Sequence, residues 1–198
     1  MAKRGLFIVL EGIDGTGKST QIRRLAEWLE SRGREVVTSR EPTDGPWGRK
    51  LRESAETGRL SLDEELDLFL RDRREHVGNL IQPSLEAGRD VILDRYYFST
   101  MAYQGARGKH PDEIRALNEA FAPVPDILLV LDLDVDAALE RIGIRGDTAN
   151  EFERHDSLQR CRGIFLGISG LPFARRIDAG KPVDEVVTQI REAVEPML

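Results

Sequence analysis

The sequence predicts an α/β fold, with one parallel sheet of about five strands held between two layers of helices. Two observations predict it. Short, continuous apolar runs recur along the 198-residue chain, and such runs are typical of strands that are buried on both faces. Segments with apolar residues at helical spacing separate these runs. Strands joined through helices pair in parallel with right-handed crossovers, so helices cover both faces of the sheet.

The first expected strand covers residues 6–10, and similar apolar runs follow at 36–38, 91–93 and 127–131. A fifth strand, at residues 173–177, has a weaker pattern because Arg175 and Arg176 interrupt it. In sheets of this class, ligands bind at the carboxyl ends of the strands. Functional residues are therefore expected directly after each strand.

Four helical segments are expected between and after these strands. The first has its apolar face at residues 22–29 and ends near Gly33. Ser61 and Glu64 form a capping box that opens the second, whose apolar face continues to residue 80. Two more are expected at residues 135–142 and 183–194.

The composition excludes several classes of protein. With 40% hydrophobic and 32% charged residues, the chain can bury a sizeable core, and we expect a single domain over residues 1–198. A net charge of −6 argues against a nucleic-acid coat, which needs a broadly basic surface. No apolar run approaches the ~20 residues that span a bilayer. One cysteine and no secretory leader pattern predict a cytoplasmic location.

A glycine-rich segment follows the first strand and precedes the first helix. Residues 12–19 match the phosphate-binding pattern G-x-x-x-x-G-K-[ST] in full. Glycines let backbone N–H groups surround phosphate oxygens, and the helix start adds its positive dipole. Lys18 supplies a charge near the transferred phosphoryl group, and the Ser19 hydroxyl can bind Mg²⁺. We therefore predict a three-layer P-loop NTPase fold. Its expected ATP-binding residues are Gly12, Ile13, Asp14, Gly15, Thr16, Gly17, Lys18, Ser19 and Thr20.

The remaining motifs favour a small kinase among P-loop proteins. No N-K-x-D tetrad for guanine is present, which argues against a GTPase. A kinase needs a second anion site, and Arg40 and Arg95 follow the second and third strands. Asp94 ends the third strand, where a carboxylate can hold Mg²⁺; the alternative is an N-cap of the next helix.

Arg73 lies four residues after Phe69 and four before Val77, on the apolar face of its helix. An unpaired arginine there would be costly. Either Arg73 forms an internal salt bridge or it faces a pocket beside an aromatic ring, as in a wall that binds a base.

These motifs together resemble the thymidylate kinase family over nearly the whole chain. The resemblance rests on the P-loop, Arg40-Glu41-Pro42, Phe69 with Asp72-Arg73, Asp94-Arg95-Tyr96 and Tyr103-Gln104-Gly105, in order and at matching intervals. It implies a homodimeric, cytosolic, Mg²⁺-dependent enzyme that transfers the γ-phosphoryl group of ATP to dTMP. No nucleic-acid or membrane partner is implied.

The resemblance also implies roles for single residues. Asp14 accepts from the deoxyribose 3′-hydroxyl, and Arg40 and Arg95 hold the acceptor phosphate. Tyr103 closes against the sugar carbon that lacks a 2′-hydroxyl; its alternative is an ordinary half-buried helix tyrosine. The base pocket is formed by Phe69, which stacks on thymine, by Arg73, which donates to a carbonyl, and by Thr100 and Gln104.

An ATP lid is expected at about residues 143–156, where Arg141, Arg145 and Arg154 flank Gly143 and Gly146. Some family members carry a catalytic arginine in the P-loop, just after the position of Asp14. Here that position is Gly15, so the lid is expected to supply it, through Arg145 or Arg154. The stretch at residues 150–153 departs from the usual lid pattern and leaves that choice open.

Two rival functions remain at this point. One is a kinase of another nucleotide or of a deoxynucleoside, against which Arg40, Arg95 and Tyr103 argue. The other is a nucleotide-binding regulator with weak catalysis, which the altered lid suggests. The catalytic residues expected for a dTMP kinase are Lys18, Asp94 and Arg95 together with Arg145 or Arg154.

Overall fold

The computed structural model describes residues 4–58, 60–145 and 155–198. Within these residues, the sheet has five parallel strands in the order β2-β3-β1-β4-β5. The strands are β1 (Phe7–Glu11), β2 (Val36–Arg40), β3 (Asp90–Asp94), β4 (Ile127–Asp132) and β5 (Ala174–Asp178). The predicted α/β fold with a parallel sheet between helices is confirmed.

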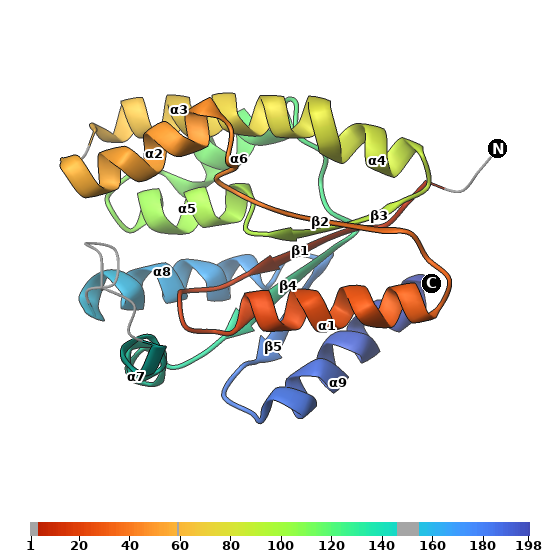
Figure 1. Cartoon of the computed structure of the whole chain (residues 1–198). Coiled ribbons are helices and arrows are strands. Elements are labelled where there is room, and N and C mark those ends of the chain that lie inside the picture. The colour runs from red at the N-terminus through yellow and green to blue at the C-terminus, as the bar shows by residue number, and fades with distance from the viewer. Residues whose placement is uncertain (1–3, 59, 146–154) are drawn as a thin grey trace.

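Helices cover both faces of the sheet (Figure 1). The layer below it in the figure contains α1 (Lys18–Ser31) and α9 (Val183–Val194), which pack against each other. The layer above contains α2 (Pro46–Thr57), α3 (Leu62–His76), α4 (Gln82–Glu86), α5 (Tyr97–Gly105) and α6 (Pro111–Glu119). A π-helical turn, Val77–Ile81, joins α3 to α4. α7 (Val135–Arg145) precedes α8 (His155–Ile168), which packs against α5.

The core lies around the central strands. Every residue of β1 and β4 is buried, including Phe7 to Leu10 and Leu128 to Leu131. β2 is an edge strand and is only partly buried. This gradient follows from the strand order, because β1 and β4 have a neighbour on each side and helices on both faces.

The strand register brings the carboxyl ends of β1, β2 and β3 to one edge. Asp94 pairs in register with Leu10 on one side and with Arg40 on the other. Glu11, the last residue of β1, pairs with Val130 of β4. The residues that follow these strands therefore meet at a single edge, as expected for a ligand site in such a sheet.

The expected elements form with small shifts in their ends. The strand expected at 36–38 extends to Arg40, and the one expected at 173–177 runs from Ala174 to Asp178. Ser61 and Glu64 make the expected capping box of α3, and Gly33 follows α1 with a positive φ of 78°.

Sequence periodicity did not predict α2, α4, α5, α6 or α8. α5 is buried around most of its surface, so it lacks a polar stripe that would reveal a helical period. In α2, by contrast, few residues are apolar, so there is no apolar stripe from which a helical period could be recognised. Both helices nevertheless border the site described below.

Among the described residues, no helix is both long and apolar enough to cross a membrane.

Candidate active site

The glycine-rich loop between β1 and α1 has a backbone that only glycine adopts without strain at three points. Gly12, Gly15 and Gly17 have φ values of 140°, 83° and 88°. A Cβ atom at Gly12 would lie 2.4 Å from the Leu131 carbonyl oxygen. The first turn of α1 has no side-chain cap among the described residues. The loop and helix start thus form a cradle whose N–H groups suit an anion.

Lys18 is buried beneath this loop. Its Nζ donates to the carbonyl oxygens of Gly12 and Ile13, at 3.0 and 3.1 Å. Burial, followed by repulsion from the Arg95 guanidinium, lowers the pKa of Lys18 to about 8. An arriving phosphate would add negative charge beside this ammonium, whose hydrogen bonds among the described residues go to uncharged oxygens. Lys18 is therefore placed to respond to an anion in the loop.

Ser19 and Asp94 fit a magnesium site. The Ser19 hydroxyl donates to Asp94 Oδ2 at 3.2 Å, and Asp94 Oδ1 is buried without a hydrogen-bond partner among the described residues. Hydroxyl and carboxylate oxygens are ligands that Mg²⁺ prefers, usually alongside waters and substrate phosphates. A magnesium ion bound in this way does not need a cluster of three or more His, Cys, Asp or Glu side chains. No cluster of that kind that could hold a metal ion occurs among the described residues. Asp94 is not an N-cap, because Tyr96 occupies that position of α5.

Asp14, which belongs to the loop, forms a charged bridge with Arg95. The Arg95 guanidinium is ion-paired with Asp14 and also donates to the Gly12 carbonyl oxygen at 3.3 Å. The Tyr103 hydroxyl donates to Asp14 Oδ2 at 3.2 Å. Burial alone would raise the pKa of Asp14, but the charges of Arg95 and Lys18 outweigh it and lower the pKa to about 2. Asp14 is therefore ionised at neutral pH.

The Arg95 backbone is held in an uncommon conformation. Its φ of 69° makes it the one described non-glycine residue in the left-handed region. Such strain occurs mainly at functional sites, where neighbouring contacts impose it. Here the Arg95 N–H donates to the Leu10 carbonyl oxygen at 3.0 Å, which ties it to the end of β1.

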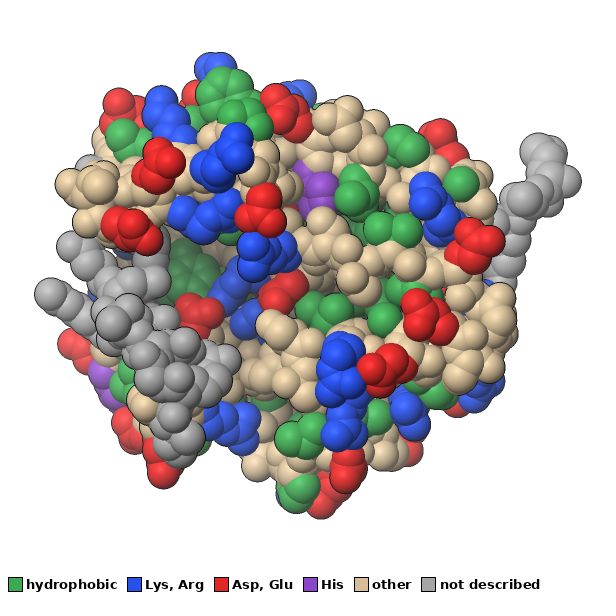
Figure 2. All heavy atoms as spheres, in the orientation of Figure 1, with side chains coloured by type: hydrophobic (Ala, Val, Ile, Leu, Met, Phe, Trp, Pro, Cys, Tyr) green, Lys and Arg blue, Asp and Glu red, His purple; other side chains and the backbone are tan. Residues whose placement is uncertain are grey.

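Two pockets meet at this bridge. The outer pocket contains the phosphate loop, and the inner one lies between α3 and α5. Figure 2 shows basic side chains gathered around the recess that opens onto them. Both pockets are lined by Asp14, Glu41, Pro42, Arg52 and Arg95. A ligand in one pocket therefore lies next to a ligand in the other.

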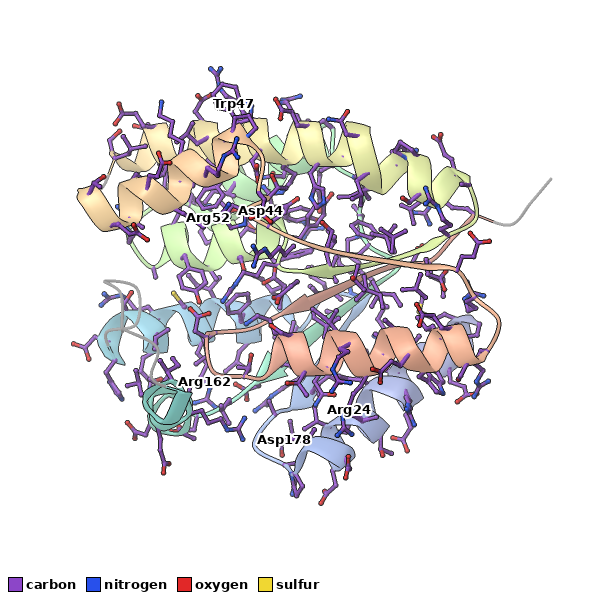
Figure 3. The ribbon with its side chains drawn as sticks, in the orientation of Figure 1. Arg24, Asp44, Trp47, Arg52, Arg162 and Asp178 are labelled. Carbon is purple, nitrogen blue, oxygen red and sulfur yellow. The ribbon has the colours of Figure 1, made fainter. Side chains whose placement is uncertain are left out.

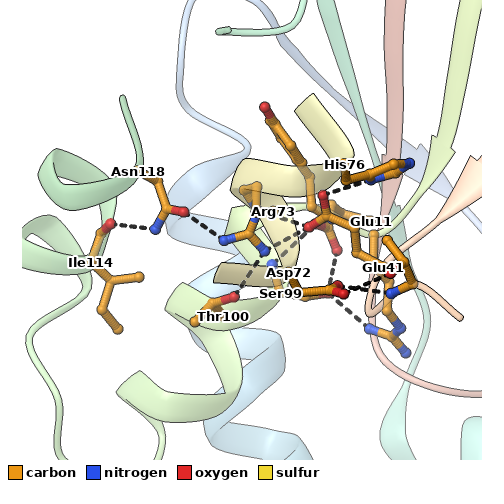
Figure 4. Close-up of polar contacts among 12 residues, drawn as sticks. Glu11, Glu41, Asp72, Arg73, His76, Ser99, Thr100, Ile114 and Asn118 are labelled. Carbon is orange, nitrogen blue, oxygen red and sulfur yellow. Dashed lines mark hydrogen bonds and ion pairs between the residues drawn. The ribbon is translucent and has the colours of Figure 1, made fainter. Parts of the chain in front are cut away.

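Arg73 lines the inner pocket and is paired with polar side chains inside the protein (Figure 4). Its guanidinium contacts Glu41 Oε2 at 2.7 Å, Asn118 Oδ1 at 2.5 Å and Thr100 Oγ1 at 3.3 Å. The second oxygen of Glu41 contacts His76 Nδ1 at 3.0 Å. Arg73 thus makes the internal salt bridge and also faces the pocket, so the two interpretations of its position are compatible.

The inner pocket offers an aromatic face and an unused acceptor. Phe69 and Tyr103 line it and are half-buried, whereas Thr100 and Gln104 line it and are buried. Gln104 Nε2 donates to the Leu62 carbonyl oxygen at 3.3 Å, whereas its Oε1 is buried and finds no partner among the described residues. An aromatic ring beside an arginine and an open amide oxygen suits a planar base with polar edges.

Comparisons with known proteins agree with this geometry. The sequence profile of the thymidylate kinase family matches residues 10–190. The chain is 55% identical over 192 residues to a thymidylate kinase of Akkermansia muciniphila, covering 97% of this chain and 92% of that protein. It is 56% identical over 185 residues to one from Xanthomonas oryzae pv. oryzae, covering 93% and 81%. The chain belongs to the thymidylate kinase family. The resemblance drawn from its motifs is confirmed.

The residues expected from the family pattern do not all converge in this structure. Arg40 borders the phosphate pocket but is exposed, and it is paired with Asp44 at 2.9 Å. Arg141 donates to the Ala179 carbonyl oxygen at 3.1 Å. The side chain of Arg145, all of Arg154 and most of the expected lid at 143–156 lie outside the described residues.

Sequence reasoning missed several residues that lie in or beside this candidate site. Arg52 of α2 lies beside Asp44 at the junction of the two pockets (Figure 3) and donates to Asp44 at 3.0 Å. Glu41 and Asn118 hold Arg73, and Glu11 is buried at the end of β1. No spacing rule in the sequence singles out Arg52 or Asn118. Glu11 carried a signal that was not used: a charged residue ending a strand that is otherwise apolar.

Proposed function

We propose that this chain transfers the γ-phosphoryl group of ATP to dTMP, giving dTDP and ADP for dTTP synthesis. The observation that carries the proposal is the meeting of two pockets at Asp14 and Arg95, one beside a P-loop and one shaped for a base. Membership of the thymidylate kinase family supports dTMP as the acceptor, and no comparison favours another substrate.

The phosphates of ATP bind in the glycine-rich loop, at Gly12, Ile13, Asp14, Gly15, Thr16, Gly17, Lys18, Ser19 and Thr20. Lys18 leaves the loop carbonyls and contacts the β- and γ-phosphates. Ser19 and Asp94 hold Mg²⁺, directly or through its waters. When bound, Mg²⁺ supplies positive charge to the phosphate oxygens. Arg141 and the lid at about 143–156 cover the nucleotide, and Arg145 or Arg154 adds a catalytic guanidinium.

The acceptor dTMP binds in the inner pocket. Phe69 stacks on thymine, Arg73 donates to a base carbonyl, and Gln104 and Thr100 complete the polar edge of the base site. Arg95, joined by Arg40, holds the acceptor phosphate through planar guanidinium contacts. Asp14 then exchanges its ion pair with Arg95 for the deoxyribose 3′-hydroxyl, and Tyr103 closes against the unsubstituted 2′-carbon.

Catalysis follows from alignment and neutralisation of charge. The acceptor is already an oxyanion near neutral pH, so no strong general base is needed. Lys18 and a lid arginine stabilise the transferring group, while Arg95 offsets the repulsion between the two anions. Closure of the lid excludes water, which limits hydrolysis of ATP.

The proposal also covers the domain organisation, the oligomeric state and the location of the enzyme. The chain acts as a single catalytic domain and assembles as a homodimer in the cytoplasm, as its family resemblance implies. Sedimentation analysis tests the dimer.

A coupled assay of ADP release tests the acceptor directly. dTMP, dUMP, UMP, AMP and thymidine are offered in turn with ATP and Mg²⁺, with dTMP expected to give the highest kcat/KM. Faster turnover of UMP or thymidine would contradict the proposal. Binding of dTMP and ATP without turnover would instead favour the regulator.

A further inference from the structure

Glu11 is a buried carboxylate to which the proposed chemistry gives no role. It ends β1 with no exposed surface, between the phosphate loop and α5. Burial raises its pKa to about 7, despite the nearby charge of Arg95 and the hydrogen bonds from Ser99 and Tyr96. A carboxylate in such a place is costly unless its hydrogen bonds are well made. The contacts of Glu11 show what that arrangement achieves.

One oxygen of Glu11 holds the start of α5 (Figure 4). Glu11 Oε1 accepts from the backbone N–H groups of Tyr96 and Ser99, at 2.7 and 3.0 Å. These are the N-cap residue and the third residue of a helix that has no side-chain cap of its own. Glu11 therefore caps α5 from a distant strand.

The same contacts fix the backbone on both sides of Arg95. Its own N–H is held by the Leu10 carbonyl oxygen, and the next N–H, that of Tyr96, is held by Glu11. Leu10 and Glu11, consecutive residues of β1, thus hold the N–H groups of Arg95 and Tyr96, which follow β3; we call this pair of hydrogen bonds a clamp. The left-handed φ of 69° at Arg95 lies within this clamp.

The second oxygen acts on the Arg95 side chain through a hydroxyl. Ser99 Oγ donates to Glu11 Oε2 at 2.6 Å, and it accepts from Arg95 Nη1 at 3.0 Å. A serine hydroxyl has one hydrogen, so donating it to Glu11 leaves only lone pairs for Arg95. The Glu11 carboxylate thereby orients the Ser99 hydroxyl so that its hydrogen points to Glu11 and its lone pairs point to the Arg95 guanidinium.

We propose that Glu11 is a positioning residue that orients Arg95 toward the acceptor phosphate, through the α5 backbone and through Ser99. This inference rests on the proposed function, which assigns Arg95 to that phosphate. The positioning requires a group that accepts at both oxygens, so glutamine is not equivalent. The amide NH₂ of Glu11→Gln would donate to Ser99 Oγ and turn the hydroxyl hydrogen toward Arg95.

The test compares binding of dTMP with binding of thymidine, which lacks the phosphate. Calorimetric titration of folded Glu11→Gln at pH 8, where most of Glu11 is ionised in the wild type, without ATP, is expected to show dTMP affinity reduced about tenfold, equivalent to ~1.4 kcal/mol. Thymidine affinity should stay within about twofold, because the base pocket keeps its contacts. Asp90→Asn is the matched control: Asp90 is also buried, accepts a backbone N–H (from Leu6, 2.8 Å), and lies at the opposite edge of the sheet. It should leave both affinities unchanged.

A double-mutant cycle separates positioning from general damage. In an Arg95→Ala background, Glu11→Gln is expected to have no further effect on dTMP affinity. If Glu11→Gln does not fold, Ser99→Ala removes the link to the guanidinium while Glu11 keeps its backbone contacts. It should weaken dTMP by about threefold and spare thymidine.

Equal losses for dTMP and thymidine would overturn the inference, as would an undiminished effect of Glu11→Gln in the Arg95→Ala background. Unchanged dTMP affinity in Arg95→Ala would also overturn it, while dTMP turnover by the wild-type protein would leave the proposed function standing. Failure of the wild-type protein to phosphorylate dTMP would instead reject the proposed function itself.

Discussion

At the scale of single residues, the site is a set of charges whose neighbours control them. Lys18 and Asp14 lie in the same loop, yet their pKa values move for different reasons. Burial dominates at Lys18 and weakens the hold on its proton, whereas the cations near Asp14 overcome the effect of burial there. Before the reaction, the loop therefore holds an ionised Asp14 and a Lys18 ammonium. Among the described residues, the hydrogen bonds of that ammonium go to uncharged oxygens.

Replacing Lys18 with alanine is expected to lower kcat by at least about a thousandfold, because charge stabilisation of the transferring group is lost. The measurement is the coupled ADP-release assay with dTMP, with circular dichroism as the check of the fold. The fold should persist, since the hydrogen bonds of Lys18 to the described residues go to carbonyl oxygens and Thr16 of its own loop. Turnover close to that of the wild type would remove Lys18 from the mechanism.

The depressed pKa of Lys18 predicts proton uptake when ATP binds at alkaline pH. In the free protein the ammonium is charged below a pKa of about 8 and neutral above it. Bound phosphates favour the charged form and raise that pKa, so at pH 9 binding should take up close to one proton. Titrations in two buffers of different ionisation enthalpy measure this number.

Lys18→Arg is the matched control for that titration, because a guanidinium keeps its charge at pH 9. At saturating ATP its uptake should be near zero. Equal proton uptake by Lys18→Arg and the wild type would assign the proton to another group.

At the scale of elements, α3 links local sequence signals to the site. Its capping box is complete: the Ser61 hydroxyl accepts from the Glu64 N–H at 3.3 Å, and the Ser61 N–H donates to Glu64 Oε2 at 3.0 Å. The same helix carries Phe69 and Arg73 into the inner pocket. Ser61 lies two to three turns before Phe69 and Arg73 in this helix, and its capping bonds involve neither side chain.

Ser61→Ala is therefore expected to reduce the free energy of unfolding by about 1 kcal/mol while leaving kcat unchanged. Urea denaturation measures the first quantity and the ADP-release assay the second. Thr57→Ala at the end of α2 provides a comparison, since it removes an exposed hydroxyl that donates within its own helix, to the Glu53 carbonyl oxygen. A large fall in kcat for Ser61→Ala would mean that the helix start is coupled to the chemistry.

At the scale of the whole molecule, stability comes from the buried sheet. Leu129 of β4 is fully buried, whereas Leu117 of α6 is 47% exposed. Leu129→Ala is expected to cost about 3 kcal/mol and to lower Tm by roughly 10 °C. Leu117→Ala, the same chemical change on the surface, should cost under about 0.5 kcal/mol. Thermal unfolding measures both, and similar shifts for the two variants would contradict this view of the core.

The molecule is acidic as a whole and basic where it is expected to bind phosphates. A net charge of −6 coexists with an outer pocket whose four cations, Lys18, Arg40, Arg52 and Arg95, outnumber its three carboxylates, Asp14, Glu41 and Asp94. Parallel strands bring the residues after β1, β2 and β3 to one edge, so a few cations suffice to concentrate charge there. The net charge therefore bears on which molecules the outer surface can bind, but it does not predict the charge inside the site.

The sequence by itself determined the sheet, the phosphate loop and the family. Each of these depends on neighbours in the chain: apolar runs, the spacing of glycines around Lys18, and short motifs directly after strands. Periodicity also indicated that Arg73 turns inward, because it shares a helix face with apolar residues.

Only the tertiary structure decided which groups hold the site residues in place. Glu41 and Asn118 meet Arg73 from distances of 32 and 45 residues along the chain, and Glu11 meets Ser99 across 88. No local pattern encodes such pairs, because hydrogen bonds between distant segments are set by strand order and helix packing. The sequence located the chemistry, and the fold supplied the partners that orient it.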